Sequence, residues 1–217
     1  MPPVTRGLPS LLVVSPANNG VKSELLYRTA EAKYPTEWTR DGKFLLFGVL
    51  GAGGPDIWGM SVSDKHPGPL FDTIYNEIYA SVSPNGKWIA YQTDSSGRMQ
   101  VQVAPFDGIS RGTKRTYEGI SLETGGGLPR WRADGKELFY ISGTGTMMSV
   151  PVNSAGDEFQ HGKATPLFTT RTITHTFNLY DVSADGQRFI VNLPLEWAEA
   201  SPVTVMTNWT EKLKKDH

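Results

Sequence analysis

One short motif and two later side chains could together perform serine hydrolase chemistry. Ser110 lies within Gly108-Ile109-Ser110-Arg111-Gly112, and His175 and Asp181 follow it in the chain. A Gly-x-Ser-x-Gly serine acts as a nucleophile when it sits on a sharp turn between a strand and a helix. Here the motif falls between two expected antiparallel strands, and no helix follows it. We therefore expect a plain loop, with no catalytic residues.

Metal and thiol chemistry find little support in the residue types. The chain has no cysteine, which excludes disulfides, thiolate zinc sites and a cysteine nucleophile. Its four histidines lack the i, i+2 or i, i+4 spacing that directs two imidazoles at one ion. They are His66, His161, His175 and His217. We expect surface histidines, no metal site and no cofactor.

The elements that would position any functional side chain come from a fourfold repeat. An apolar residue, then Asp-Gly or Asn-Gly, then an apolar run rich in β-formers recurs around four glycines that lie 44, 49 and 51 residues apart. This spacing suits one four-stranded propeller blade per repeat. Asp-Gly and Asn-Gly accept positive φ angles, so we expect tight two-residue hairpin turns. The four glycines are Gly42, Gly86, Gly135 and Gly186.

Alignment on these glycines singles out one set of polar side chains. The residue four before each glycine is always apolar: Trp38, Val82, Trp131 and Val182. The residue before that faces the other way, because side chains alternate along a strand. This second set could form a polar ring around a central channel and bind a polar ligand or a peptide end, with the two acids balancing the arginine. Alternatively, its members make ion pairs and hydrogen bonds between blades. The set is Glu37, Ser81, Arg130 and Asp181.

The fold class expected is an all-β propeller of four-stranded antiparallel blades, three complete and two partial. Residues 1–217 would form one propeller domain or fragment, with Leu70–Ile74 as the outer strand of its first complete blade. Trp58, Trp88, Tyr91, Phe139 and Tyr140 occupy strand positions, which indicates packing between blades rather than a stacking platform. The expected blades lie near residues 10–28, 34–74, 75–120, 128–169 and 178–207, and a short helix follows at 209–215.

The composition argues against two classes of partner, nucleic acids and membranes. Lys plus Arg is 21 and Asp plus Glu is 22, a balance that supplies no basic field for nucleic acid or for an anionic membrane. The first residues lack the pattern of a signal peptide. No window approaches the roughly 18 to 20 apolar residues of a membrane helix. We therefore expect a soluble chain whose partner is not nucleic acid.

An ordered set of motifs resembles a known family. The set looks like the TolB-like, WD-repeat-like propellers, and most of all like the carboxy-terminal propeller of bacterial membrane-bound serine/threonine protein kinases. It consists of Tyr34-Pro35-Thr36-Glu37-Trp38 with Asp41-Gly42-Lys43, Asp56-Ile57-Trp58, the run from Ser83 to Tyr91, Pro129-Arg130-Trp131 with the run from Asp134 to Tyr140, the run from Asp185 to Phe189, and Asn208-Trp209-Thr210.

This resemblance implies a propeller carried by a signalling protein as an extracytoplasmic or periplasmic sensor or interaction module. The family's propeller is longer, so the chain resembles a truncated form. No kinase motifs are present: there is no glycine-rich phosphate loop with its strand lysine, no His-Arg-Asp loop and no Asp-Phe-Gly. The resemblance therefore implies binding without phosphoryl transfer.

Three hypotheses of function remain, and the last of them is a purely structural fragment that binds no ligand. The leading one is a non-catalytic binding or sensor module for a protein, a peptide or a small polar ligand. The alternative is the accessory propeller of a serine peptidase of the prolyl-oligopeptidase type or of another hydrolase. Open blade edges would expose unpaired strand groups, so either the amino-terminal strands close onto the last blade or the chain pairs with another copy as a homo-oligomer.

Overall fold

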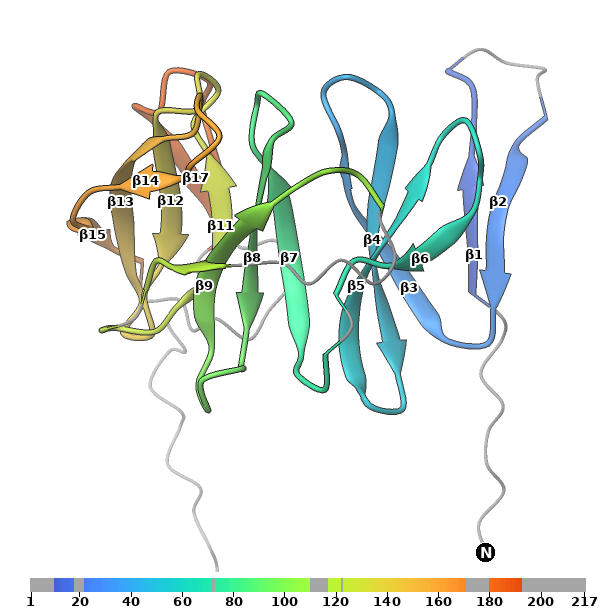
Figure 1. The fold of residues 1–217 in the computed structure, drawn as a ribbon, viewed down its shortest axis with the longest axis horizontal. Helices are drawn as coiled ribbons and strands as arrows, with labels where there is room; N and C mark the ends of the chain where they lie inside the picture. The colour runs from blue at the N-terminus through green and yellow to red at the C-terminus, as the bar shows by residue number, and fades with distance from the viewer. Residues whose placement is uncertain are drawn as a thin grey trace, which may run out of the picture.

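Residues 10–17, 22–71, 73–109, 117–121, 123–170 and 180–192 are described by a computed structural model. Within these ranges the regular structure is all β, and the strands form antiparallel sheets (Figure 1). The expected all-β class is confirmed. No helix among the described residues is long and apolar enough to cross a membrane.

The described part of the chain begins with a two-stranded sheet, which is followed by a four-stranded one. The outer face of the four-stranded sheet is covered by the hairpin, since Leu12, Leu26 and Tyr27 pack against the buried Phe47 and Met60. The first sheet pairs β1 (Ser10–Val14) with β2 (Glu24–Thr29), and the second has the order β3 (Ala32–Trp38), β4 (Phe44–Gly51), β5 (Gly54–Ser61) and β6 (Pro67–Pro69).

Three more sheets follow in chain order. The first has four strands, the second has five, and the third has two among the described residues. They contain, in turn, β7 (Glu77–Val82), β8 (Trp88–Thr93), β9 (Gln100–Pro105) and β10 (Glu118–Gly119); β11 (Gly127–Trp131), β12 (Glu137–Ile141), β13 (Thr146–Asn153), β14 (Gln160–His161) and β15 (Thr165–Thr169); and β16 (Tyr180–Val182) and β17 (Phe189–Val191).

One predicted strand is wrong. The outer strand of the second sheet is β6, not Leu70–Ile74. Pro67, Gly68 and Pro69 pair with β5, after which the chain bends away and leaves Ile74 exposed. Proline and glycine are tolerated here because β6 is an edge strand, and no further strand pairs with its outer side among the described residues. The predicted helix at 209–215 lies outside the described residues.

The predicted two-residue hairpin turn is also wrong. Thr39 N donates to Phe44 O (2.9 Å), so four residues stand between the closing pair. Gly42 alone has positive φ, at 73°, while the Asp41 carboxylate accepts a bond from Lys43 N (3.1 Å). The glycine of each of the other three turns likewise has a φ of 73–74°. The aspartate or asparagine therefore acts through its side chain, as in an Asx turn, and only the glycine adopts the left-handed conformation.

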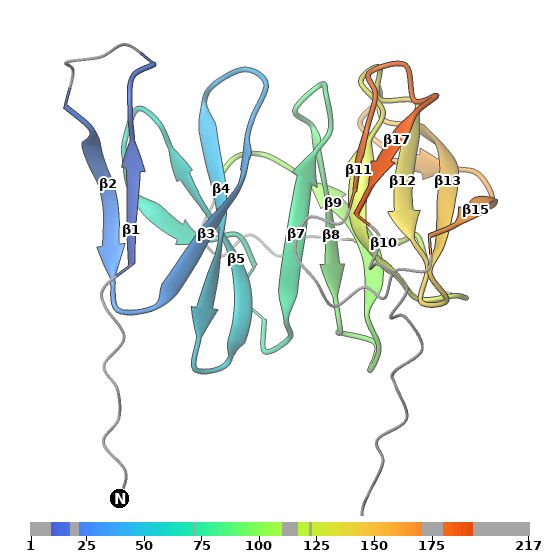
Figure 2. The ribbon, with the colours of Figure 1, turned by 180° about the vertical axis from the view of Figure 1, so that it is seen from behind.

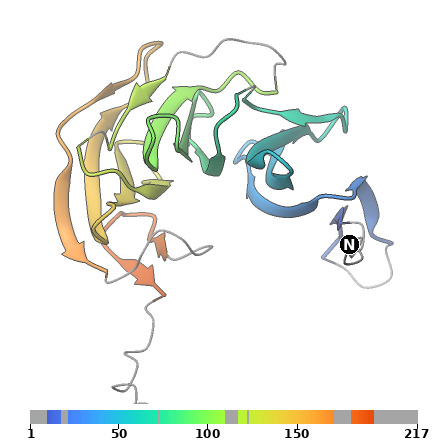
Figure 3. The same ribbon diagram turned by 90° about the horizontal axis from the view of Figure 1, so that it is seen from below.

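The sheets follow one another along an open arc (Figure 3). The hairpin β1–β2 and the pair β16–β17 stand at opposite ends of it, as the views from both sides show (Figures 1 and 2). Of the two ways to protect the edges, closure of β1–β2 onto β16–β17 is not the arrangement seen among the described residues.

Neighbouring sheets meet through a fixed register. Each first strand pairs with its second so that the residue five before the turn glycine lies opposite the residue four after it, as in Glu37 and Leu46, or Arg130 and Phe139. This face packs on the following sheet, where Leu46 shares a core with Val82. The predicted packing role of the strand aromatics is confirmed: Trp88 and Tyr140 share one core, Tyr91 and Phe139 belong to the other inter-sheet cores, and Trp58 packs on a fourth.

Candidate functional site

The four side chains of the predicted ring line one hollow. Glu37 comes from β3, Ser81 from β7, Arg130 from β11 and Asp181 from β16, and the hollow has a volume of about 350 Å³. Ser81 is buried, Asp181 is exposed, and the other two are intermediate. The structure therefore brings together one polar residue from the first strand of each of four successive sheets.

Bulges set the direction of three of these side chains. The pairing register shifts between Pro35 and Glu37, and again at the equivalent places in β7 and β11. Within the last two bulges Tyr79 (φ 56°) and Leu128 (φ 60°) have left-handed backbone, which is uncommon for large side chains. Each lies two residues before the ring residue of its strand. An extra residue in a strand re-aims the side chains after it, so these bulges help to turn Ser81 and Arg130 toward the hollow.

Glu37 joins two sheets. Its Oε2 accepts a hydrogen bond from Val82 N in β7 at 2.9 Å. Burial raises the pKa of the Glu37 carboxyl to about 7, while the bond from Val82 and the charge of Arg130 act in the opposite direction. The side chain is therefore both a contact between blades, as the structural alternative expected, and a titratable group at the hollow.

Arg130 and Asp181 form hydrogen bonds only with their sequence neighbours in the described structure, unlike Glu37. The Arg130 guanidinium donates through Nη1 to Pro129 O at 3.2 Å, and Asp181 Oδ1 accepts from Val182 N at 2.8 Å. Among the described residues, no ion pair joins Arg130 to either Glu37 or Asp181. The two acids therefore lie near Arg130 in the hollow without forming an ion pair with it. Arg130 keeps N–H donors that a ligand could use.

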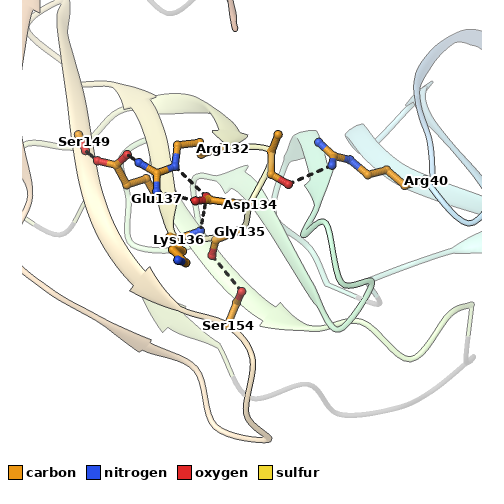
Figure 4. A network of polar contacts seen from close by, with 9 residues as sticks. Arg40, Arg132, Asp134, Gly135, Lys136, Glu137, Ser149 and Ser154 are labelled. Carbon is orange, nitrogen blue, oxygen red and sulfur yellow. Dashed lines mark hydrogen bonds and ion pairs between the residues drawn. The ribbon is translucent and has the colours of Figure 1, made fainter. Parts of the chain in front are cut away.

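The rim of the hollow consists of turn residues that the sequence analysis missed. Arg40 reaches from the first turn to donate to Ala133 O in the third, at 3.1 Å (Figure 4). The signal was present in the repeat, because the residue two before each turn glycine lines the hollow in all four turns. These residues are Arg40, Pro84, Ala133 and Ala184.

The third turn is fixed by ionic contacts. Arg132 binds both carboxylate oxygens of Asp134, at 2.7 and 2.6 Å, and also contacts Glu137 (Figure 4). Glu137 in turn accepts from Ser149 Oγ at 2.8 Å. Hydrogen bonds from Arg132 and Lys136 N hold the pKa of Asp134 well below its usual range. A bidentate pair gives this part of the rim a defined geometry.

The described part of the structure does not bring the residues considered for catalysis together. Ser110 and His175 lie outside the described residues, while Asp181 belongs to the ring. His66 and His161 are exposed, and His217 is also outside the described part. In the described ranges no three His, Asp or Glu side chains are grouped so that they could hold a metal ion.

Solved structures with a similar fold are known, although no protein-family model and no curated protein matches the chain. TolB from Acinetobacter baumannii superposes with a TM-score of 0.60 over 81% of this chain and 41% of its own, at 18% identity. A protein described as TolB from Agrobacterium tumefaciens gives 0.51 over 69% and 55%, at 19% identity. A prolyl endopeptidase reaches only 0.47, at 15% identity, over 82% of this chain and 30% of its own.

These likenesses concern the fold alone. The chain has a β-propeller architecture similar to that of TolB, and it spans 41% and 55% of the lengths of these two solved chains. The endopeptidase likeness is too low to carry an argument. Function must therefore be argued from the hollow and its side chains.

Proposed function

We propose that the chain is a non-catalytic binding module that holds a peptide end or another small polar ligand in the hollow lined by Glu37, Ser81, Arg130 and Asp181. The observation that carries the proposal is the convergence of four polar side chains from four separate strands on one space of about 350 Å³. That volume lies at the small end of the range of about 300 to 1,000 Å³ found for ligand sites.

The charges suggest the kind of ligand. Two carboxyl groups and one guanidinium complement a molecule with both a cationic and an anionic group, such as a short peptide with free ends. Arg130 suits a carboxylate, because its planar fork can donate two parallel hydrogen bonds. Asp181 is the more accessible acid and suits an ammonium group, whereas Glu37 is partly engaged by Val82 N.

The parent protein forms a second part of the proposal. We infer a propeller derived from a receptor-like bacterial serine/threonine kinase, acting outside the cytoplasm as a sensor. The support is the set of sequence motifs that ends with Asn208-Trp209-Thr210. Sequencing the DNA that flanks this coding segment tests the proposal. A kinase domain and a membrane helix encoded upstream would support this origin, and a hydrolase domain would favour the peptidase alternative.

Calorimetry with three small peptides tests the site. The probes are tri-alanine with free ends, its N-acetylated form and its C-terminal amide. We expect the free form to bind best, and Arg130→Gln to weaken it about tenfold, which corresponds to roughly 1.4 kcal/mol and to the lower range for a hydrogen bond to a charged group. Arg28→Gln, an exposed change on β2, is the matched control and should have no effect.

The result that opposes the proposal is equally specific. If no probe binds the wild-type chain, or if Arg130→Gln and Arg28→Gln behave alike, the hollow is not a site for peptide ends. Unfolding curves for both variants separate lost binding from lost structure.

A further inference from the structure

Three junctions join the four successive sheets from β3 to β17, and the same two repeat positions share a core at each of them. The residue four after a turn glycine shares a core with the residue four before the next turn glycine. Ala90 shares a core with Trp131, and Phe139 shares one with Val182, just as Leu46 does with Val82. The pairing register is the same in each of the four sheets that contain a repeat turn, so each of these sheets has one of the two residues on each face.

At each end of the arc, one of the two residues of this repeated pair is exposed and has no partner sheet among the described residues. Ile190 occupies the position of Phe139 and is 75% exposed, whereas Phe139 is 1% exposed. Trp38 occupies the position of Trp131 and is 51% exposed, whereas Trp131 is 7% exposed. The same local pattern therefore gives a buried pair inside the arc and two exposed apolar side chains at its ends.

One of the three junctions also has a hydrogen bond from the side chain at this position. Trp131 Nε1 donates across its junction to Ser81 O in β7 at 2.9 Å. Trp38 Nε1 instead donates to Gly42 O in its own turn, at a longer 3.2 Å. The residue equivalent to Ser81 at the far end of the arc is Asp181, which lies opposite Ile190 in the pairing of β16 with β17.

Each end also has a hollow. Beside Trp38 a groove of about 320 Å³ runs between β1 and β3 and is lined by apolar side chains that include Leu12, Val13 and Leu45. At the other end Val182, Phe189 and Ile190 border a hollow of about 360 Å³. The Thr36 hydroxyl in the groove is buried and has no hydrogen-bond partner among the described residues, which is costly for a polar group.

The end sheets are complementary. The pair β16–β17 corresponds to the first two strands of a blade, since its turn carries the repeat glycine Gly186. The hairpin β1–β2 directly precedes β3 and so corresponds to the last two strands of a blade. These two halves stand at opposite ends of the arc within one chain (Figures 1 and 3), and so they cannot meet in this conformation.

We propose that the groove beside Trp38 receives β16–β17 of a second copy of this chain, in a head-to-tail contact. Ile190 of one copy packs on Trp38 of the next, and the indole of Trp38 donates to the Asp181 main-chain oxygen of its partner. The contact repeats the three junctions already present within each chain and covers the exposed apolar side chains at both ends. A head-to-tail contact either closes into a ring or continues as a filament.

Complementary variants test this arrangement by sedimentation. We expect the wild-type chain to self-associate as its concentration rises, and Trp38→Ser and Ile190→Asp each to be monomeric. An equimolar mixture of these two variants should form a species of two chains, because one supplies an intact Ile190 end and the other an intact Trp38 end. Ile74→Asp is the matched control, since Ile74 is 89% exposed in a loop away from both ends, and it should associate like the wild type.

Three results would overturn the inference. A wild-type chain that stays monomeric at all concentrations removes the second copy as the occupant. Self-association that persists in Ile190→Asp places the contact elsewhere, and a mixture that contains only monomers rejects the head-to-tail geometry. Trp38 is half exposed and Ile190 is largely exposed, so circular dichroism should show folded variants, and this measurement separates misfolding from loss of contact.

Discussion

Glu37 Oε2 accepts a hydrogen bond from Val82 N at 2.9 Å, and this bond ties the first strand of one sheet to the first strand of the next. The same carboxyl group lines the polar hollow. A single side chain therefore contributes to both the junction between blades and the candidate site. Substitutions of Glu37 can separate its role at the junction from its role in the hollow.

Glu37→Ala should destabilise the fold, whereas Glu37→Gln should not. Alanine leaves the buried Val82 N–H without an acceptor, which costs about 1 to 3 kcal/mol. Glutamine keeps an acceptor oxygen of similar reach. Urea unfolding at pH 7 measures both. Equal losses in the two variants would mean that the charge of Glu37, and not its acceptor, stabilises the junction.

Trp131→Phe should lower the free energy of unfolding by about 1 to 2 kcal/mol, because it removes the bond to Ser81 O and part of a buried ring. Trp38→Phe is the matched change at the equivalent exposed position, where about 0.5 kcal/mol or less is expected. Both are compared by urea unfolding in dilute solution. Similar losses would contradict the assignment of Trp131 as the inter-sheet donor.

Gly86→Ala should destabilise by about 1 to 2 kcal/mol, and Gly86→Asn by less. Gly86 has φ 74°, and no atom of the described residues lies within 4 Å of an added Cβ, so we expect the cost of alanine to come from backbone strain. Asparagine tolerates this conformation better than alanine does. Thermal unfolding ranks the two variants, and the reverse order would show that the turn does not require left-handed backbone.

Glu77 should make stability depend on pH. Burial, with the nearby charges of Asp56 and Asp94 acting in the same direction, raises the pKa of its carboxyl from an ordinary 4.5 to about 7, against a hydrogen bond from Thr73. The folded state therefore binds more protons than the unfolded state between these values. The contribution to stability is complete below about pH 4.5 and is lost as the pH rises through 7.

The matching variant is Glu77→Gln, which keeps an acceptor for Thr73 and cannot ionise. We expect it to remove a decline of up to about 3 kcal/mol between pH 4.5 and 7.5, measured as urea stability at several pH values. Exposed Glu158→Gln serves as the control and should leave the slope unchanged. An unchanged slope in Glu77→Gln would show that Glu77 is not the group responsible.

Most of the fold could be predicted because its signals are local. Four turn glycines at blade spacing, each followed by an apolar run, indicate four repeats of the same hairpin. Counting back five residues from each glycine also found the side chains that line one hollow, because alternation along a strand fixes the face of each residue. The turn itself was predicted incorrectly, since Asp-Gly fits both a two-residue turn and the longer Asx turn.

The predicted outer strand at Leu70–Ile74 failed for a different reason. Its apolar residues fit a strand, but edge pairing depends on what the neighbouring strand offers, and β5 pairs with Pro67–Pro69 instead. The reach of Arg40 to Ala133 could not be foreseen either, because 93 residues separate the two and only the curvature of the arc brings their turns together.

Local sequence specifies most of the strands, the places where the chain turns and the face of a sheet that each side chain occupies. Which of those faces are covered depends on the assembled fold. Trp38 and Trp131 have the same place in the repeat, yet one is half exposed and the other is buried. Strand geometry follows from neighbours along the chain, whereas burial requires another sheet to lie alongside, and that depends on contacts between residues far apart in sequence.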